Sequence, residues 1–241
     1  MVPTRFHKSK HLIVFLSLLG LFLNGAGSPG HWQLRNGKII PFDLQETSGA
    51  QVVEKPKLAG DLDGDGDSEC LSLSGESAQI TDCSSATLWE SPEGWRVSEA
   101  QIADVTHDGK NDVVLLVWRP FRPWPADRFM PYGGRIANHQ NQEGQSCQLI
   151  LIGWQKGEYR EIWAGSALAK PISNVLVADL DADGLLELAA LESDYDAYQK
   201  GGQLTIWRWI GFGFSLLDRS EGRWERLAIM GDGVHHWLFS R

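Results

Sequence analysis

The sequence lacks the short motifs that mark the commonest enzyme classes. It has no H-E-x-x-H pair, no C-x-x-C pair and no G-x-S-x-G turn around a nucleophilic serine. The histidines are scattered, and the adjacent pair His235 and His236 would point to opposite faces of a strand. The sequence therefore predicts no catalytic residues and a protein that is not an enzyme.

Basic residues are also few. The 241 residues include 22 Lys and Arg against 31 Asp and Glu, which gives a formal net charge of −9. This balance argues against nucleic acid or an anionic membrane surface as a partner, because both are bound through positive charge. It suits a protein that carries bound cations. The hydrophobic content of 42% is enough for a sizeable core and argues against global disorder.

Long apolar runs are absent after the N-terminal segment. Residues 1–28 combine a basic start with an apolar run at 12–23 and small residues at 25–28. This pattern is typical of a secretory signal, because a spanning helix needs about 20 apolar residues. The alternative is a single uncleaved N-terminal membrane anchor, and no transmembrane bundle is expected. We therefore expect an extracytoplasmic protein that is secreted, periplasmic or at the cell surface.

Cysteines number only three, Cys70, Cys83 and Cys147. An exported chain can form disulfides, and an odd count leaves one thiol over. Cys70 and Cys83 flank a predicted hairpin near residues 75–77, which would place them opposite one another within reach of disulfide geometry. We expect a Cys70–Cys83 disulfide and a free Cys147; the alternative is that all three are reduced.

The sequence does contain an internal repeat. Residues 58–73, 101–116 and 176–191 align without gaps. Each copy has a short apolar stretch, an Asp-rich loop of nine residues and a second apolar stretch. The second stretches are too short and too β-branched or alternating for helices. The repeats therefore predict pairs of strands joined by an acidic loop.

The acidic loops predict three calcium sites. Calcium takes six to eight oxygen ligands, which acids at loop positions 1, 3, 5 and 9 and a carbonyl at position 7 would supply. Glycine at position 6 permits the sharp turn. The predicted ligands are Asp61, Asp63, Asp65, Asp67 (carbonyl) and Glu69; Asp104, Thr106, Asp108, Lys110 (carbonyl) and Asp112; and Asp179, Asp181, Asp183, Leu185 (carbonyl) and Glu187.

The alternatives to these sites are three polar Asp-Gly turns without metal, or an EF-hand. The second loop has one carboxylate fewer and is expected to bind most weakly. An EF-hand needs a bidentate Glu at position 12 and flanking helices. Position 12 is Ser72, Leu115 or Ala190, so we reject the EF-hand.

The three D-x-D/T-x-D-G-x-x-E/D loops resemble the FG-GAP repeats of integrin-like propellers, also called VCBS-type repeats. The resemblance covers about residues 56–226, although no Phe-Gly…Gly-Ala-Pro signature is present. It implies that each calcium loop joins the first two strands of a four-stranded blade. It also implies that ligand-binding loops lie on the opposite face.

On this template the expected fold class is all-β, a small β-propeller with four blades of four antiparallel strands. Residues 31–241 would form one domain, with repeats at 56–95, 96–170 and 171–226. A fourth, composite blade would combine residues 227–241 with 31–50, whose strands form a hairpin around Asn36 and Gly37. Sharing this blade between the two termini would close the ring and hide its edges.

An insert at residues 119–147 interrupts the second repeat and is rich in Arg, Pro and aromatic residues. Long loops in compact domains are often functional, and Arg and Trp often anchor interfaces. With the loop at 193–202 it would form one face; the alternative is a lid that only covers the ring. The predicted ligand-binding residues are Arg119, Arg122, Trp124, Arg128, Tyr132, Tyr195 and Tyr198.

These features favour an exported, calcium-stabilised module that binds an unknown protein or glycan ligand. One alternative is a propeller-scaffold enzyme acting on glycans, for which Asp127, Asp194 and Asp196 are the acidic candidates outside the loops. The other is a purely structural module of an envelope assembly.

Overall fold

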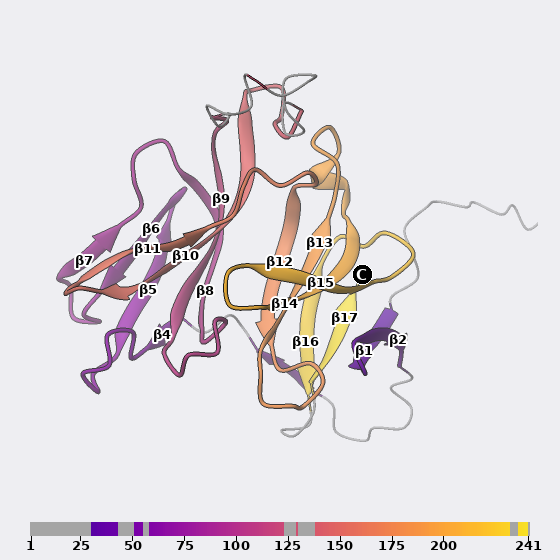
Figure 1. Cartoon of the computed structure of the whole chain (residues 1–241), viewed down its shortest axis with the longest axis horizontal. Helices are drawn as coiled ribbons and strands as arrows, with labels where there is room; N and C mark the ends of the chain where they lie inside the picture. The colour runs from indigo at the N-terminus through magenta and orange to yellow at the C-terminus, as the bar shows by residue number, and fades with distance from the viewer. Residues whose placement is uncertain are drawn as a thin grey trace, which may run out of the picture.

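The computed structural model describes residues 30–42, 51–54, 58–122, 129, 138–231 and 236–240. The segment 1–28, interpreted above as a targeting signal, lies outside them. The described chain is all-β apart from short 3-10 turns, of which η4 (Tyr198–Lys200) is one, and is arranged in four antiparallel sheets (Figure 1). It contains no helix with the length and apolar character needed to cross a membrane.

Each repeat segment forms one four-stranded sheet. The first-repeat sheet has the order β4 (Ala59–Gly60), β5 (Glu69–Ser74), β6 (Ser77–Thr81) and β7 (Thr87–Glu90). The second-repeat sheet consists of β8 (Arg96–Ala103), β9 (Asp112–Pro120), β10 (Gln145–Gln155) and β11 (Glu158–Ala164). The third-repeat sheet consists of β12 (Ile172–Ala178), β13 (Glu187–Glu192), β14 (Gln203–Trp209) and β15 (Phe214–Arg219).

The two ends of the chain share the fourth sheet, called here the terminal sheet. Its order is β2 (Lys38–Pro41), β1 (Gly30–Arg35), β17 (His236–Ser240), β16 (Leu227–Gly231) and β3 (Gln51–Glu54). Asn36 and Gly37 both have positive φ, as the predicted two-residue hairpin turn requires. The expectation of four strands is wrong in one respect: β3 pairs with the otherwise open edge of β16 and makes a fifth strand.

The sheets stack face to face because their central strands are apolar on both sides. Side chains of β9 alternate between two cores, Val113, Leu115 and Val117 in one and Val114, Leu116 and Trp118 in the other. The first core is shared with the first-repeat sheet and the second with the third-repeat sheet. A third core joins the third-repeat sheet to the terminal sheet. Continuous apolar runs therefore mark sheets that are covered on both faces.

Side-chain hydrogen bonds join the first strands of neighbouring sheets. Glu99 of β8 accepts hydrogen bonds from Asn174 Nδ2 (2.7 Å) and from Val175 N (2.6 Å) in β12. Asn174 Oδ1 in turn accepts a hydrogen bond from Leu227 N of β16 (2.7 Å). A pocket of about 540 Å³ lies along these strands and is lined from all four sheets, Leu73, Glu99, Val175 and Leu227 among them.

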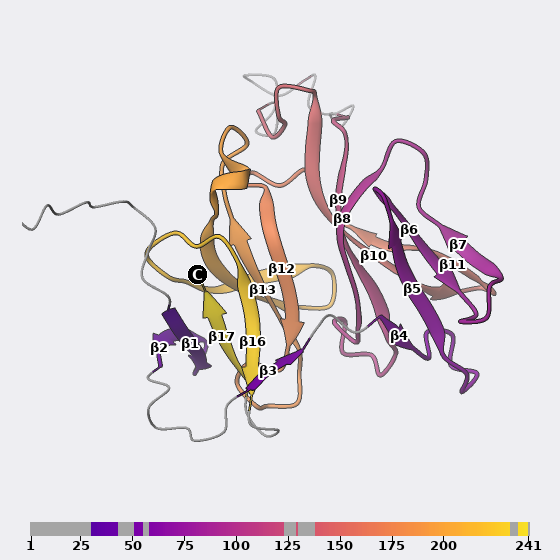
Figure 2. The ribbon, with the colours of Figure 1, turned by 180° about the vertical axis from the view of Figure 1, so that it is seen from behind.

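None of the four described sheets closes on itself, and their closure into a ring stays a prediction. The first-repeat sheet and the terminal sheet lie at opposite ends of the array in both views (Figures 1 and 2). Among the described strands, each sheet pairs strands only within itself. What the structure establishes is therefore four antiparallel sheets, the last of which combines strands from both termini.

Candidate metal centres and a candidate ligand pocket

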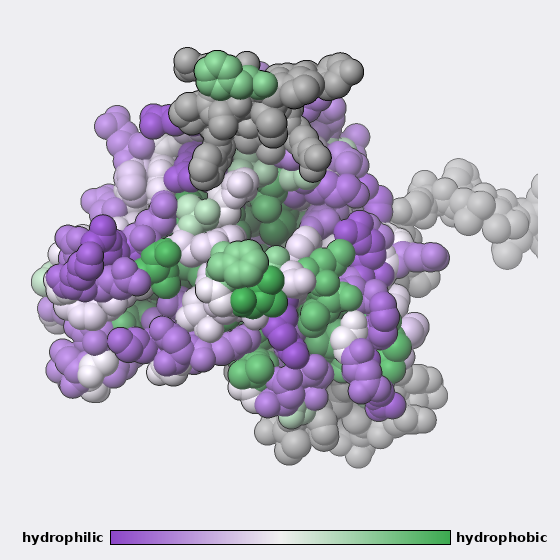
Figure 3. Space-filling model, viewed as in Figure 1, coloured by the Kyte–Doolittle hydropathy of each residue, from purple (hydrophilic) through white to green (hydrophobic). Residues whose placement is uncertain are grey.

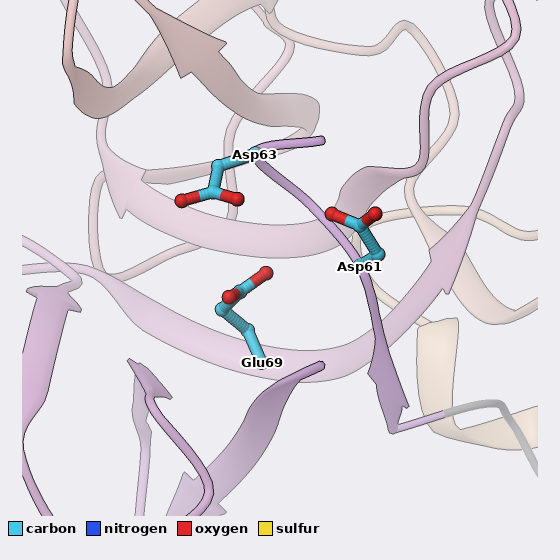
Figure 4. Close-up of side chains that lie close together, drawn as sticks. All are labelled: Asp61, Asp63 and Glu69. Atoms are coloured by element: carbon cyan, nitrogen blue, oxygen red, sulfur yellow. The ribbon is translucent and has the colours of Figure 1, made fainter. Parts of the chain in front are cut away.

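The first acidic loop joins β4 to β5 and brings three carboxylates together. One oxygen each of Asp61, Asp63 and Glu69 lies within 4.8 Å of the others, and Figure 4 shows the three side chains facing a common space. Glu69 is buried, and it accepts a hydrogen bond from Leu62 N (2.7 Å). Carboxylates that converge in this way can hold a divalent cation, so the loop fits the group that its sequence predicts.

Backbone N–H groups hold the other side of the first loop. Asp61 accepts hydrogen bonds from Gly64 N (2.6 Å) and Gly66 N (3.1 Å), and Asp65 accepts one from Asp67 N (2.8 Å). Gly66 has a φ of 95°, which a residue with a side chain rarely adopts. Asp65 lies outside the group of three converging carboxylates. The turn is thus fixed by its own amide groups, and the acids at positions 1, 3 and 9 form the centre.

The second loop, between β8 and β9, has the same backbone pattern without the same convergence. Asp104 accepts hydrogen bonds from Asp108 N (3.1 Å) and Gly109 N (2.9 Å). Thr106 Oγ1 donates to Asp112 (2.9 Å) at the position where the other loops have a carboxylate. Burial, with the nearby charges of Asp108 and Asp104, raises the pKa of Asp112 to about 6 despite the hydrogen bond from Thr106. The Lys110 N–H donates to Asp108.

The third loop, between β12 and β13, again brings three acids together, Asp179, Asp181 and Glu187. Glu187 is fully buried and accepts a hydrogen bond from Leu180 N (2.9 Å). A residue that the loop sequence does not reveal, Arg208 of β14, forms ion pairs within this group. The Leu185 N–H donates to Asp183 (2.8 Å). The third loop therefore differs from the first because a basic side chain, that of Arg208, contacts its acids.

The loops are also joined to one another. Asn111 of the second loop donates a hydrogen bond to the Asp61 carbonyl of the first (3.0 Å). His107 Nε2 of the second loop lies 2.9 Å from the Leu186 carbonyl oxygen and 3.1 Å from the Leu186 nitrogen of the third. The three loops therefore lie side by side at one end of the sheets.

A pocket of about 690 Å³ lies beside the start of the insert, called here the Arg119 pocket. Arg119 follows the buried part of β9, stacks over Trp95 at 5.4 Å and forms an ion pair with Glu161 of β11 (3.7 Å). Burial lowers the pKa of Arg119, and the charge of Glu161 partly offsets this. The Arg119 pocket is lined by Trp95, Arg119, Arg122, Gln148, Glu161 and Trp163 among others.

Gln148 is nearly buried in this pocket. Its Nε2 donates to Ser146 Oγ (3.1 Å), whereas its Oε1 has no hydrogen-bond partner within the described part of the chain. A second pocket of about 550 Å³, mostly apolar, shares Trp163 and residues 165–167 with the first. On the face of the molecule drawn in Figure 3, apolar residues gather near the centre.

The predicted ligand-binding residues divide into three groups. Arg119 and Arg122 line the Arg119 pocket. Tyr195 and Tyr198 pack against Trp118 at centroid distances of 5.8 and 4.8 Å, and Tyr195 OH donates to the Leu168 carbonyl (2.7 Å). They support the 165–171 connection and line neither pocket. Trp124, Arg128 and Tyr132 lie outside the described residues.

The expected disulfide between Cys70 and Cys83 is present, and Cys147 is a free thiol. The reason given for the pairing needs correction, because the residue opposite Cys70 is Thr81 and not Cys83. Cys83 lies just beyond β6 with a φ of 60°, and this turn brings its sulfur back to Cys70. Burial raises the pKa of Cys147 to about 12.

No protein-family model matches the chain, and no curated protein is significantly similar to it.

Proposed function

We propose that the protein is an exported, calcium-stabilised binding module of the FG-GAP type, and that it binds an acidic glycan in the Arg119 pocket. The four sheets would be the blades of a small propeller around the pocket that Glu99 and Leu227 line. The Cys70–Cys83 disulfide supports an oxidising, extracytoplasmic location. The observation that carries the binding proposal is the composition of the Arg119 pocket.

That composition suits a sugar with a carboxylate. A volume of about 690 Å³ is within the usual range for a small-molecule site. Guanidinium groups recognise carboxylates, so Arg122 and Arg119 supply positive charge, although Arg119 also pairs with Glu161 of the pocket wall. Trp95 and Trp163 offer apolar ring surface, although the Trp163 N–H already donates to the Phe212 carbonyl (2.9 Å). The Gln148 side-chain carbonyl accepts no hydrogen bond from any described residue, and a sugar hydroxyl is a donor. A uronic acid unit combines all these groups.

The test is an array that pairs uronate-containing oligosaccharides with their neutral counterparts, followed by titration calorimetry on the best ligand. We expect binding to the acidic members only, with a loss of about tenfold or more in Arg119→Gln, because removing one charged hydrogen bond costs about 1.5–3 kcal/mol. Trp95→Ala should weaken binding as well.

The matched control is Arg160→Gln, because Arg160 is also in the second-repeat sheet but pairs with Glu158 at the β10–β11 turn. Equal binding of neutral and acidic sugars, or unchanged affinity in Arg119→Gln, would contradict the proposal. Binding of envelope proteins and of no oligosaccharide would point to a protein ligand instead.

A further inference from the structure

The acids of the third loop are contacted by a positively charged side chain of the same protein, that of Arg208 on β14. Arg208 Nη2 lies 3.0 Å from Asp181 Oδ2 and 3.0 Å from Asp183 Oδ2, and it also contacts Glu187 Oε1. Arg208 Nε donates a second hydrogen bond to the same Glu187 oxygen at 2.8 Å. One guanidinium thus contacts acids from positions 3, 5 and 9 of the loop, which are positions predicted to bind calcium.

The sheet register places Arg208 there. Arg208 of β14 is the direct partner of Glu187 in β13, so its side chain starts beside the buried acid. Its side chain is only 25% exposed, and that of Glu187 is 0% exposed. Arginine stays protonated at every physiological pH, so this charge is always available. A metal ion in the same place would have to displace the guanidinium or share the acids with it.

The other two loops have no such residue at the equivalent position. Continuing the β5–β6 register by one residue places Asp82 across from Glu69. Continuing the β9–β10 register places Gly153 across from Asp112, and a Cβ on Gly153 would meet Asp112 Oδ1 at 3.4 Å. In the described part of the chain, Asp61, Asp63 and Glu69 form no ion pair with a basic side chain. The first loop therefore keeps uncompensated negative charge.

Each acidic cluster has one buried polar atom that forms no hydrogen bond with a described residue: Asp181 Oδ1 in the third loop and a tyrosine hydroxyl beside the first. Tyr159 of β11 is buried, 7% exposed, and its hydroxyl makes no hydrogen bond of good geometry with any described residue. Burial, the charges of Glu69 and Asp63, and an interaction of the hydroxyl with the Glu69 side chain raise the pKa of Tyr159. A buried hydroxyl beside three carboxylates that pair with no basic side chain of the described chain is the environment expected next to a bound cation or its water.

From these contacts we infer that the two acidic clusters use different counterions: Arg208 serves the third loop, and a divalent cation serves the first. The inference rests on the proposed calcium-stabilised module and refines it. Three loops of similar sequence then supply one metal site. The arginine makes the stability of the third loop independent of the metal concentration, whereas the first loop responds to it.

The experiment is calcium titration calorimetry on the purified, metal-stripped chain and its variants, with terbium luminescence as a second readout. The unchanged protein should bind one equivalent of calcium, which Asp63→Asn removes and Asp181→Asn does not. Arg208→Gln should bind two equivalents, and adding Asp181→Asn to it should return the count to one. Arg219→Gln on the neighbouring β15 is the matched control and should bind one.

The inference is overturned if Asp181→Asn alone removes an equivalent, or if Arg208→Gln gains none. Arg208→Gln is prepared in calcium, so that a loop left without its counterion still folds, and is then exchanged into defined free calcium. The Asp181→Asn result does not depend on that variant. Failure of glycan binding would affect only the Arg119 pocket, and calcium binding at both loops would overturn only this inference.

Discussion

Trp32 and Leu238 are direct partners in the antiparallel ladder between β1 and β17, although they come from opposite ends of the described chain. Leu238 is 1% exposed and shares a core with Leu34, Leu227 and Ile229. Trp32 also meets Trp224 edge to face at 5.3 Å. The two termini are therefore a structural unit and not loose tails.

Removing either terminus should destabilise the whole domain. Deleting residues 30–41 or 227–241 exposes a strand edge and the apolar face of the third-repeat sheet. As a point variant, Leu238→Ala should lower the free energy of unfolding by about 2–5 kcal/mol in urea denaturation, because it leaves a cavity in a buried core. Leu58→Ala, at a half-exposed leucine, is the control and should change little. A deletion variant that stays monomeric and melts at the same temperature would contradict the prediction.

Much of this arrangement could be predicted from sequence because its signals are local. The Asp-Gly loops mark where two strands meet, and Asn36-Gly37 marks a hairpin. The pairing of β3 with β16 could not be predicted, because a four-residue strand carries no information about a distant open edge. That Arg208 lies directly across from Glu187 could not be predicted either. It depends on the register of β13 against β14, which the loop sequence does not encode.

The Cys70–Cys83 disulfide should raise the free energy of unfolding, and Cys147 should form no disulfide. For a closed loop of about 15 residues, chain entropy gives a contribution of roughly 3 kcal/mol. We expect the double variant Cys70→Ser/Cys83→Ser to lose stability on that order in urea denaturation. Under native, non-reducing conditions iodoacetamide should label none of the three cysteines, because Cys147 is buried with a raised pKa. Peptide mapping that finds Cys147 in a disulfide would disprove the pairing.

Glu99 should make stability fall as pH rises. Burial raises the pKa of Glu99 above the ordinary value of 4.5, while the hydrogen bonds from Asn174 and Val175 oppose this shift. The folded protein then holds the Glu99 proton more tightly than the unfolded chain does. The free energy of unfolding therefore decreases as pH rises from about 4.5 to the folded pKa of Glu99.

The variant Glu99→Gln should remove this part of the pH dependence, measured as urea midpoints between pH 4 and pH 8. Glu76→Gln is the control, because Glu76 is exposed and pairs with Arg96 at the surface. Glu192 also has a raised pKa, but its contribution is the same in both variants and cancels from the comparison. Parallel curves for Glu99→Gln and the unchanged protein would show that Glu99 does not titrate differently on folding.

Removing metal should lower the melting temperature through the first loop alone. A ligand that binds only the folded state adds about 2.7 kcal/mol at a concentration of 100 times its dissociation constant. Scanning calorimetry with saturating calcium and with chelator should therefore differ for the unchanged protein. Asp63→Asn, which breaks the group of three acids in the first loop, should melt at the same temperature in both conditions. Thr106→Ala, in the loop whose acids do not converge, should keep the full response to calcium. A chelator effect that survives in Asp63→Asn would mean that the stabilising ion binds elsewhere.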